Sequence, residues 1–360
     1  MAKINVGVLG ATGMVGQNYV RLLAGHPWFN VTFVAASPRS AGKSYVEATA
    51  GRWQMTSDVP KIVRDLTVVD ANDPKNARGE CDFVFSALEM DKQAVRELEE
   101  AYAKAGIPVF SNASAHRWTD DVPMLIPEIN ADHLEIIPAQ KKNRGWGKGF
   151  IVVKPNCSLQ SYITPVHALR AAGYPFSKMI LTTLQAVSGA GYPGVPSLDM
   201  VDNIVPFIGG EEEKSEQEPK KIFGEISDGK FLIDESFEIS AHCNRVPVVD
   251  GHTACVSLEF ASKKPSLEEI KTIWRNFKGE PQKLDLPMAP KKPIIYIDEL
   301  NRPQPRKDRD NDKAMAVTVG RLRECPVFNI RFVGLSHNTV RGAAGGGILN
   351  AELAHKKGLV

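Results

Sequence analysis

The segment KINVGVLGATGMVG, residues 3–16, decides the architecture of the first half of this 360-residue chain. Its apolar start predicts a β-strand over residues 3–9, and helical potential follows over residues 14–24. Between them, Gly10, Gly13 and Gly16 permit a tight turn that brings backbone N–H groups to a pyrophosphate at a helix N-terminus. A glycine turn at the first strand–helix junction predicts a dinucleotide-binding loop, with Thr12, Met14 and Val15 among its contacts. The alternative is an ordinary turn between a strand and a helix.

The same alternation continues to about residue 150. Strands are predicted over residues 31–36, 82–87 and 108–111, and an amphipathic helix over residues 91–105. Alternating strands and helices predict a parallel sheet with right-handed crossovers, so we expect an α/β fold that begins with a Rossmann-type domain.

The end of the second predicted strand indicates which cofactor is bound. NAD-binding folds usually place an acidic residue there for the ribose 2′-hydroxyl, whereas residues 35–43 contain no carboxylate. Ser37, Arg39 and Ser40 suit a 2′-phosphate, to which Arg39 can donate two hydrogen bonds. We therefore expect NADP, with Ser86 as a further contact; the alternative is a solvated basic loop.

Beyond residue 150 the pattern changes to that of an α+β domain. Residues 178–186, 238–240 and 253–261 are β-rich, and residues 266–276 have helical spacing, which predicts a larger, partly antiparallel sheet. Residues 299–313 are dense in Pro, Arg and Asp and are expected to form a solvent-exposed excursion. The Gly/Ala-rich residues 338–355 predict a helix that returns to the first domain. The expected domains are residues 1–153 with 337–360, and residues 154–336.

Composition excludes several classes of function. The 44 basic and 42 acidic residues give a charge of +2, which provides no electrostatic footprint for nucleic acid or a membrane surface. No apolar stretch approaches the roughly 18 residues needed to cross a bilayer, and the first residues resemble a strand rather than a signal peptide. The five cysteines are odd in number and form no C-x-x-C pair, so neither a disulfide framework nor a metal site is expected. We expect a cytoplasmic protein.

One cysteine lies in a setting that favours catalysis. Cys157 follows Pro155 and Asn156 and precedes residues 159–172, which have helical potential. A helix N-terminus there would lower the pKa of the thiol and supply N–H groups for an oxyanion. The alternative is a buried structural cysteine. His252, His242 and His116 are candidates for a nearby base, and the residues alone do not choose among them.

Together these motifs resemble the aspartate-semialdehyde dehydrogenases, in particular the archaeal and fungal branch. The resemblance spans essentially the whole chain. The matching segments, in order, are residues 10–16, 37–43, 111–117 (SNASAHR), 155–158 (PNCS), 185–191 (QAVSGAG), 211–214 (EEEK), 245–252 and 338–345 (NTVRGAAG).

The resemblance implies a role for each matching residue. Cys157 is expected to be the nucleophile, His252 the general acid/base, and Gln185 the residue that orients the substrate. Arg245 is expected to hold the substrate carboxylate and Glu211 its amino group. Arg117 and Lys214 are expected to bind the phosphate, and Asn156 is expected to contact the substrate. The residues expected to lie near the nicotinamide are Ser188, Gly189 and Asn338.

The reaction so implied is the NADPH-dependent reductive dephosphorylation of L-aspartyl-4-phosphate to L-aspartate 4-semialdehyde, through a thioester on Cys157. This reaction belongs to the biosynthesis of lysine, methionine and threonine. The resemblance also implies a second domain that carries both catalysis and dimerisation, and a homodimer or homotetramer. Two alternatives are a malonyl-CoA reductase of the same fold and a non-catalytic NADP-binding sensor.

Overall fold

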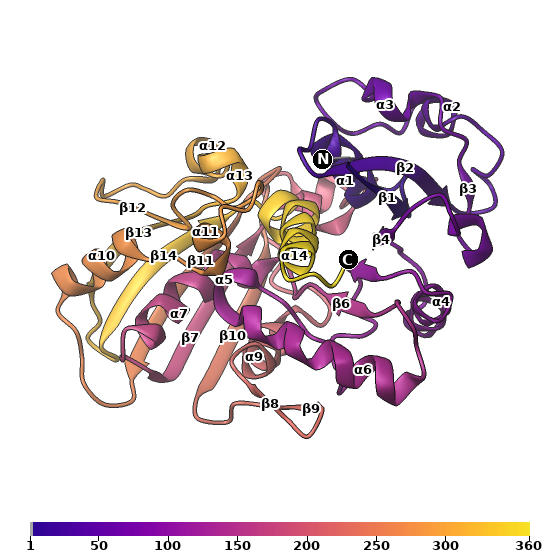
Figure 1. Ribbon diagram of the computed structural model, residues 1–360. Coiled ribbons are helices and arrows are strands. Elements are labelled where there is room, and N and C mark those ends of the chain that lie inside the picture. Colours follow the sequence, from indigo (N-terminus) through magenta and orange to yellow (C-terminus); the bar gives the residue numbers. More distant parts are fainter. Residues whose placement is uncertain (1–2) are drawn as a thin grey trace.

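The computed structural model describes residues 3–360, which form two sheets with helices around them (Figure 1). The first sheet is parallel throughout, in the order β3-β2-β1-β4-β5-β6. This is the strand order of a Rossmann fold. Its strands are β1 (Ile4–Leu9), β2 (Phe29–Ala36), β3 (Val69–Asp70), β4 (Phe83–Ser86), β5 (Val109–Ser111) and β6 (Ile151–Val153).

Helices accompany this sheet, and their ends follow local sequence signals. Gly13 is the N-cap of α1, which begins at Met14, and the side chain of Asp91 caps α4 by accepting from the backbone N–H of Gln93 and Ala94. The helices of this half are α1 (Met14–Leu23), α2 (Tyr45–Thr49), α3 (Lys61–Arg64), α4 (Lys92–Lys104), α5 (Pro127–Asn130) and α6 (Ile137–Arg144).

The second sheet is mixed, in the order β10-β7-β11-β14-β13-β12. Only the outer pairs β10–β7 and β12–β13 are parallel. This confirms the expected partly antiparallel sheet. Its strands are β7 (Phe176–Gln185), β10 (Glu238–Arg245), β11 (His252–Phe260), β12 (Ile294–Ile297), β13 (Val317–Glu324) and β14 (Ile330–Ser336), and a separate hairpin pairs β8 (Glu225–Ser227) with β9 (Lys230–Leu232).

One face of the second sheet packs on helices and the other is open. Trp274 of α10 contacts Phe332 of β14, and its ring N–H donates to the carbonyl of Pro165 in α7. On the opposite face, alternate residues such as Ile180, His242 and Cys255 are exposed. The helices of this half are α7 (Ile163–Ala171), α8 (Ser197–Met200), α9 (Glu211–Ile222), α10 (Leu267–Asn276), α11 (Glu280–Lys283), α12 (Pro305–Asp308) and α13 (Asn311–Ala314).

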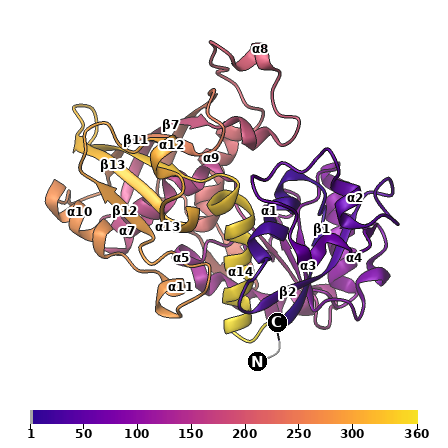
Figure 2. The same ribbon diagram turned by 90° about the horizontal axis from the view of Figure 1, so that it is seen from above.

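The last helix, α14 (Gly345–Lys356), lies between the two halves (Figures 1 and 2). It shares a hydrophobic core with β1 and β2, which confirms the predicted return to the first domain. A side chain at Gly347 would collide with the hydroxyl of Tyr19, so glycine is required for this close approach. The exact domain boundaries remain a prediction.

Two segments differ from the expectation. Residues 299–313 are not a wholly exposed excursion, because Asp308 is buried and accepts hydrogen bonds from the side chain of Arg302 and from the N–H of Gln304. The segment is attached to the second domain by Thr318 of β13, whose hydroxyl donates to the carbonyl of Asp308. The predicted C-terminal helix begins with a π-helical turn, Val340–Ala344, before α14.

Arg341, in that turn, ties the elements around the domain junction together. Its guanidinium donates to Glu128 of α5 (2.6 Å), to Gln160 (3.0 Å), to the carbonyl of Met315 (3.0 Å) and to Thr164 of α7 (3.2 Å). Both Arg341 and Glu128 are almost fully buried. Removing one partner of such a pair leaves an uncompensated buried charge, which costs far more than removing both.

We therefore expect Arg341→Met to lower the free energy of unfolding by about 3–5 kcal/mol, measured by urea denaturation. The double variant Arg341→Met/Glu128→Leu should recover most of this loss. Arg275→Met, which removes a surface pair with Asp298, serves as the control and should change stability by at most about 1 kcal/mol. Equal losses for Arg341→Met and Arg275→Met would contradict the structural role of the buried pair.

Candidate active site

A cysteine and a histidine from different parts of the chain meet at the junction of the two domains. Cys157 follows β6 and begins the 3₁₀ turn Ser158–Ser161, and His252 is the first residue of β11. The Sγ atom of Cys157 lies 3.4 Å from Nε2 of His252. His116 instead contacts Thr119 and the carbonyl of Arg96, and His242 is exposed on the open sheet face. Of the three candidate histidines, the structure brings His252 to the sulfur.

The other ring nitrogen of His252 sets its tautomer. The backbone N–H of Ala186 donates to Nδ1 at 3.0 Å, so the neutral ring carries its proton on Nε2, facing the sulfur. Burial, and next the charge of Arg245, lower the pKa of His252 to about 3. The ring is therefore neutral at physiological pH and acts as a hydrogen-bond donor toward Cys157.

The pKa of Cys157 is raised, whereas the sequence led us to expect a lowered one. Burial raises the pKa of the thiol to about 11, with Glu211 acting in the same direction, while Lys154, Arg117 and Arg245 oppose the rise. The helical turn that follows is only four residues long. Desolvation of the sulfur therefore outweighs the favourable charges, and the thiol is protonated at neutral pH.

Two carboxylates of α9 organise the residues around the cysteine. Glu211 accepts from Asn156 (2.8 Å), Gln185 (3.1 Å) and Lys214 (2.8 Å). Four of the predicted substrate residues thus form one cluster. They meet because β7 ends at Gln185, α9 begins at Glu211, and the loop before Cys157 brings Asn156 to within 2.8 Å of Glu211.

The second carboxylate, Glu218, was not predicted. It accepts from the guanidinium of Arg117 (2.8 Å) and from the backbone N–H of Asn156 (2.6 Å). Arg117 also donates to the carbonyls of Lys154 and Asn112, so within the described residues two of its five N–H donors remain for a ligand. The spacing of residues 211, 214 and 218 on one helix face was the available sequence signal.

Lys154 is a second functional residue that sequence reasoning missed, although it stands three positions before the cysteine. It is buried, and its Nζ has no hydrogen-bond partner among the described residues. Burial lowers its pKa to about 7, and the nearby Cys157 raises it. When charged, Lys154 favours the thiolate of Cys157.

A cavity of about 150 Å³ opens in front of the cysteine. Asn338 lines this cavity. Its side chain donates to the hydroxyl of Ser188 (2.8 Å) and accepts from the N–H of Gly251, which is next to His252 (2.8 Å). Arg245, at the end of β10, donates to the carbonyl of Ala186 (2.7 Å). Of the predicted residues, the cavity is lined by Met14, Val15, Arg117, Asn156, Cys157, Ser188, Gly189 and Asn338.

The predicted cofactor loop has the shape that a dinucleotide requires. Gly10 has φ +71°, a conformation that favours glycine, and a side chain there would strike the carbonyl of Ala87. The N-terminus of α1 has no side-chain cap, and Met14 and Val15 of its first turn face the catalytic cavity. Ser37 and Arg39 are exposed just beyond β2, with no carboxylate among residues 35–43. These residues fit an NADP molecule that extends toward Cys157.

The side chain of Ser86 makes a contact that was not predicted. It is fully buried, and its hydroxyl donates to Glu99 at 2.6 Å, as does the hydroxyl of Ser111. Its side chain therefore joins the ends of β4 and β5 to α4, and a contact of Ser86 with the cofactor stays a prediction. Burial raises the pKa of Glu99 to about 7.

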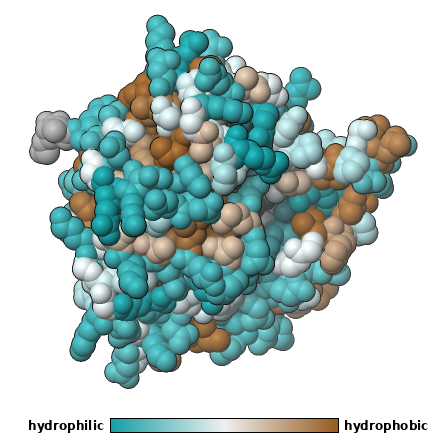
Figure 3. Space-filling view, turned by 90° about the vertical axis from the view of Figure 1, so that its right-hand side faces the viewer, coloured by the Kyte–Doolittle hydropathy of each residue, from teal (hydrophilic) through white to brown (hydrophobic). Residues whose placement is uncertain are grey.

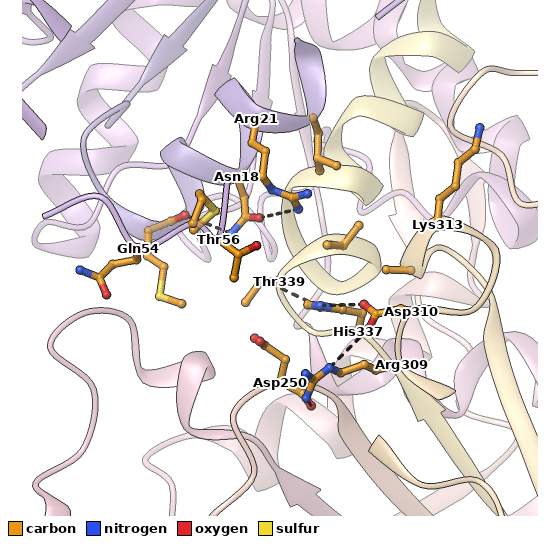
Figure 4. A pocket seen from close by; sticks show the side chains of 15 residues that line it. Asn18, Arg21, Gln54, Thr56, Asp250, Arg309, Asp310, Lys313, His337 and Thr339 are labelled. Atoms are coloured by element: carbon orange, nitrogen blue, oxygen red, sulfur yellow. Dashed lines mark hydrogen bonds and ion pairs between the residues drawn. The ribbon is translucent and has the colours of Figure 1, made fainter. Parts of the chain in front are cut away.

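A larger cavity of about 540 Å³ lies beside the catalytic one (Figure 4). Asn18 and Arg21 point into it from α1, and Asp250, Arg309, Asp310 and His337 line the opposite side. It shares Met14 and Thr339 with the catalytic cavity but does not contain Cys157. The folded residues 299–313 form part of its wall.

Comparison with known proteins follows the division into two domains. Residues 5–137 match the family model described as semialdehyde dehydrogenase, NAD binding domain, and residues 166–341 match semialdehyde dehydrogenase, dimerisation domain. The chain is 46% identical to the aspartate-semialdehyde dehydrogenase of Schizosaccharomyces pombe, with 100% of both chains covered. It is 50% identical to that of Methanothermobacter thermautotrophicus, over 98% of this chain and 99% of the relative.

Solved structures point to the same family as the sequence relatives. The structure of aspartate semialdehyde dehydrogenase with NADP from Candida albicans superposes with a TM-score of 0.91 at 40% identity, covering 100% of both chains. An aspartate semialdehyde dehydrogenase II from Vibrio cholerae, at 23% identity and a TM-score of 0.75, shares the fold. Fungal and archaeal relatives are thus markedly more similar than this bacterial one, which confirms the predicted branch. The chain belongs to the aspartate-semialdehyde dehydrogenase family.

Proposed function

We propose that this enzyme reduces L-aspartyl-4-phosphate to L-aspartate 4-semialdehyde with NADPH and releases phosphate. The observation that carries the proposal is the 3.4 Å contact between His252 and Cys157, and Cys157 lines a cavity that Met14 and Val15 of the cofactor loop also line. The relatives named for this activity, and the Candida albicans structure with NADP, support it. Phosphate release identifies the reaction, because a malonyl-CoA reductase would act on a thioester instead.

The charged residues divide between the two ends of the substrate. Arg245 binds the carboxylate, Glu211 the amino group, and Arg117 with Lys214 the phosphate. Glu211 and Arg117 already hold protein partners, so substrate binding adds to existing hydrogen bonds rather than creating isolated charge contacts. Gln185 and Asn156 position Glu211 from either side.

In the forward reaction, the thiol of Cys157 first loses its proton to solvent, and the resulting thiolate attacks the acyl carbon. The bond to the phosphate oxygen breaks and a thioester remains on the enzyme. NADPH, when bound, supplies the hydride. The carbonyl oxygen then carries the negative charge, which the Nε2–H of His252 holds by hydrogen bonding. Collapse of this oxyanion breaks the C–S bond, releases the aldehyde and regenerates the thiolate.

In this order of chemical steps, His252 does not need to act as a general acid or base. The oxyanion collapses without a proton from the ring, and the N–H of Ala186 keeps Nδ1 as an acceptor. We propose that His252 is a neutral hydrogen-bond donor to the sulfur and to the substrate oxygen. Lys154 favours the thiolate electrostatically.

The chain also has the features of an oligomeric, intracellular enzyme. Residues 166–341 match a dimerisation domain, and we propose a homodimer or homotetramer. The five cysteines within the described residues are free thiols, which suits a reducing compartment such as the cytoplasm. No helix among residues 3–360 has the length and apolar character needed to cross a membrane.

The reaction is tested by following NADPH formation from aspartate 4-semialdehyde and NADP⁺, with and without inorganic phosphate. We expect turnover that depends on phosphate and disappears in Cys157→Ala, because thioester cleavage by phosphate is the reverse of the proposed release. Turnover without phosphate, or only with coenzyme A, would contradict the substrate assignment. Folded, NADP-binding protein with no turnover would favour the sensor.

The donor role of His252 is tested by comparing His252→Gln with His252→Ala. Glutamine keeps an N–H donor but has no titrating ring. We expect His252→Ala to lower kcat by about 10²–10³-fold, as for loss of an oxyanion donor, and His252→Gln to remain within about tenfold of wild type. Equal losses in both variants would show that the imidazole transfers a proton.

The protonation state of Cys157 is tested by the pH dependence of its alkylation, quantified by mass spectrometry of the Cys157 peptide. With a thiol pKa near 11, the thiolate fraction and the rate rise about tenfold per pH unit between pH 7 and 9. Lys154→Met should react more slowly than wild type at pH 7, because a favourable charge is lost. A plateau below pH 8 would instead indicate a thiolate–imidazolium pair.

A further inference from the structure

Lys221 of α9 is buried, and the reaction described above uses other residues. The face of the protein shown in Figure 3 is mostly hydrophilic, as expected where charged side chains are solvated. Within residues 3–360 only Lys154, Lys220 and Lys221 are buried lysines, and Lys221 is 2% exposed. Burying a charged group is costly unless the group is paired or hydrogen-bonded. The contacts of Lys221 therefore indicate what the fold gains from placing it there.

The ammonium group of Lys221 is held by three backbone carbonyls. Its Nζ donates to the carbonyls of Arg117 (2.8 Å), Thr119 (2.9 Å) and Val122 (2.8 Å). Three acceptors match the three N–H donors of a charged lysine, whereas the neutral amine has only two. Burial lowers the pKa of Lys221 to about 7, and three nearby carboxylates oppose this change. The carbonyl oxygens act in the same direction as these carboxylates, so the arrangement favours the ammonium form.

The three carbonyls belong to residues 117–122, which lie outside helices and strands. This segment is located between β5 and α5, and its N–H groups make turn hydrogen bonds, such as that from Arg117 to the carbonyl of Ser114 (3.3 Å). The hairpin β8–β9 adds a further backbone contact, from the N–H of Phe231 to the carbonyl of Asp120 (3.2 Å). Because local turns alone do not place a loop on the rest of the protein, the three bonds from the lysine are its principal anchor to α9.

Helix α9 contacts Arg117 at two points. Glu218 accepts from its guanidinium (2.8 Å), and Lys221, one turn later, donates to its main-chain carbonyl (2.8 Å). Residues 211, 214, 218 and 221 lie on one face of the helix, because steps of three or four residues return to the same side. Lys221 therefore fixes Arg117 relative to Lys214, the other residue proposed to bind the phosphate.

The backbone position of Arg117 decides where its free donors point. Its guanidinium also donates to the carbonyls of Lys154 and Asn112, so the far end of the side chain is held by the protein. Lys221 holds the near end. The planar fork of an arginine binds phosphate well only when its orientation is set. Loss of the near anchor is therefore expected to weaken phosphate binding selectively, because Arg245 and Glu211, proposed for the rest of the substrate, stand on β10 and at the start of α9.

We propose that Lys221 is a positioning residue for phosphate, which holds the backbone of Arg117 so that its free N–H donors face the phosphoryl group. The proposal rests on the phosphate-binding role of Arg117 given above. The hold of Lys221 on residues 117–122 does not depend on that role.

The test compares Lys221→Met with the matched control Lys220→Met. Both remove one positive charge from the same turn of α9, and Lys220 pairs with the exposed Glu235 and Glu238. The reverse reaction gives KM values for inorganic phosphate, aspartate 4-semialdehyde and NADP⁺, and hydrogen–deuterium exchange reports on residues 117–122. We expect Lys221→Met to raise KM for phosphate by about tenfold or more, to leave the other two KM values within about twofold, and to speed exchange in the segment. Lys220→Met should match wild type in all four measurements.

A double-variant cycle shows whether Lys221 acts through Arg117. In an Arg117→Lys background the planar fork is already lost, so adding Lys221→Met should raise KM for phosphate by less than about threefold. A full tenfold effect in that background would overturn action through Arg117. A general loss of stability would instead lower the amount of active protein and leave KM for phosphate unchanged.

An unchanged KM for phosphate, unchanged exchange, or equal increases in all three KM values in Lys221→Met overturns the proposal. Should this variant fail to fold, Lys221→Gln, which keeps an N–H donor, replaces it and must still raise KM for phosphate selectively. Failure of both variants to fold assigns Lys221 to stability alone and also overturns the proposal. A wild-type protein without phosphate-dependent turnover sinks the proposed reaction, and the exchange measurement then still decides whether Lys221 holds residues 117–122.

Discussion

The catalytic site depends on helix α9, whose carboxylates neutralise the buried cationic side chains around Cys157. Arg117, Lys154 and Arg245 are all buried near Cys157, and their mutual repulsion and desolvation would be costly without nearby anions. Glu211 and Glu218 of α9 supply those anions, and Glu218 in addition fixes the backbone of the cysteine loop. The helix thereby joins the end of the first sheet to the end of the second, and the geometry of the cavity follows from that connection.

A charge-balanced site also explains why a protonated thiol and a neutral imidazole suit this chemistry. The substrates are anionic, so a thiolate in the resting site would lie directly beside an anionic ligand. The structure keeps both groups neutral at rest, through burial and through the hydrogen bond from Ala186 to His252. Cations then act on the sulfur only as it becomes charged.

Local sequence patterns predicted much of the fold and a definable part of the site. The glycine loop, the first parallel strands and the returning C-terminal helix follow from periodicity and turn residues, and Cys157 follows from its turn. Strands β12, β13 and β14 were not predicted, since they are held by pairing of β14 with β11, of β13 with β14 and of β12 with β13 rather than by a local pattern. The local pattern did not choose among the three histidines; the resemblance selected His252, and the structure places it 3.4 Å from Cys157. The pKa of Cys157 could not be predicted, because desolvation is a property of the assembled interior. The hydrogen bond of Ser86 was missed for a related reason: only the fold brings Glu99 to its hydroxyl.

The position of α14 has a consequence for how the chain acquires this structure. The first domain is completed by a helix that follows the whole second domain in the chain: Glu352 binds His26, 326 residues away, and Gly347 packs on Tyr19. A nascent chain therefore exposes part of the apolar surface of β1 and β2 until α14 has been translated. By then the second domain has emerged, so β1 and β2, which are translated before it, are among the last elements to be covered. Contacts of such sequence separation slow folding, and they make the N-terminal strands the region that most needs protection from association while the ribosome is still at work.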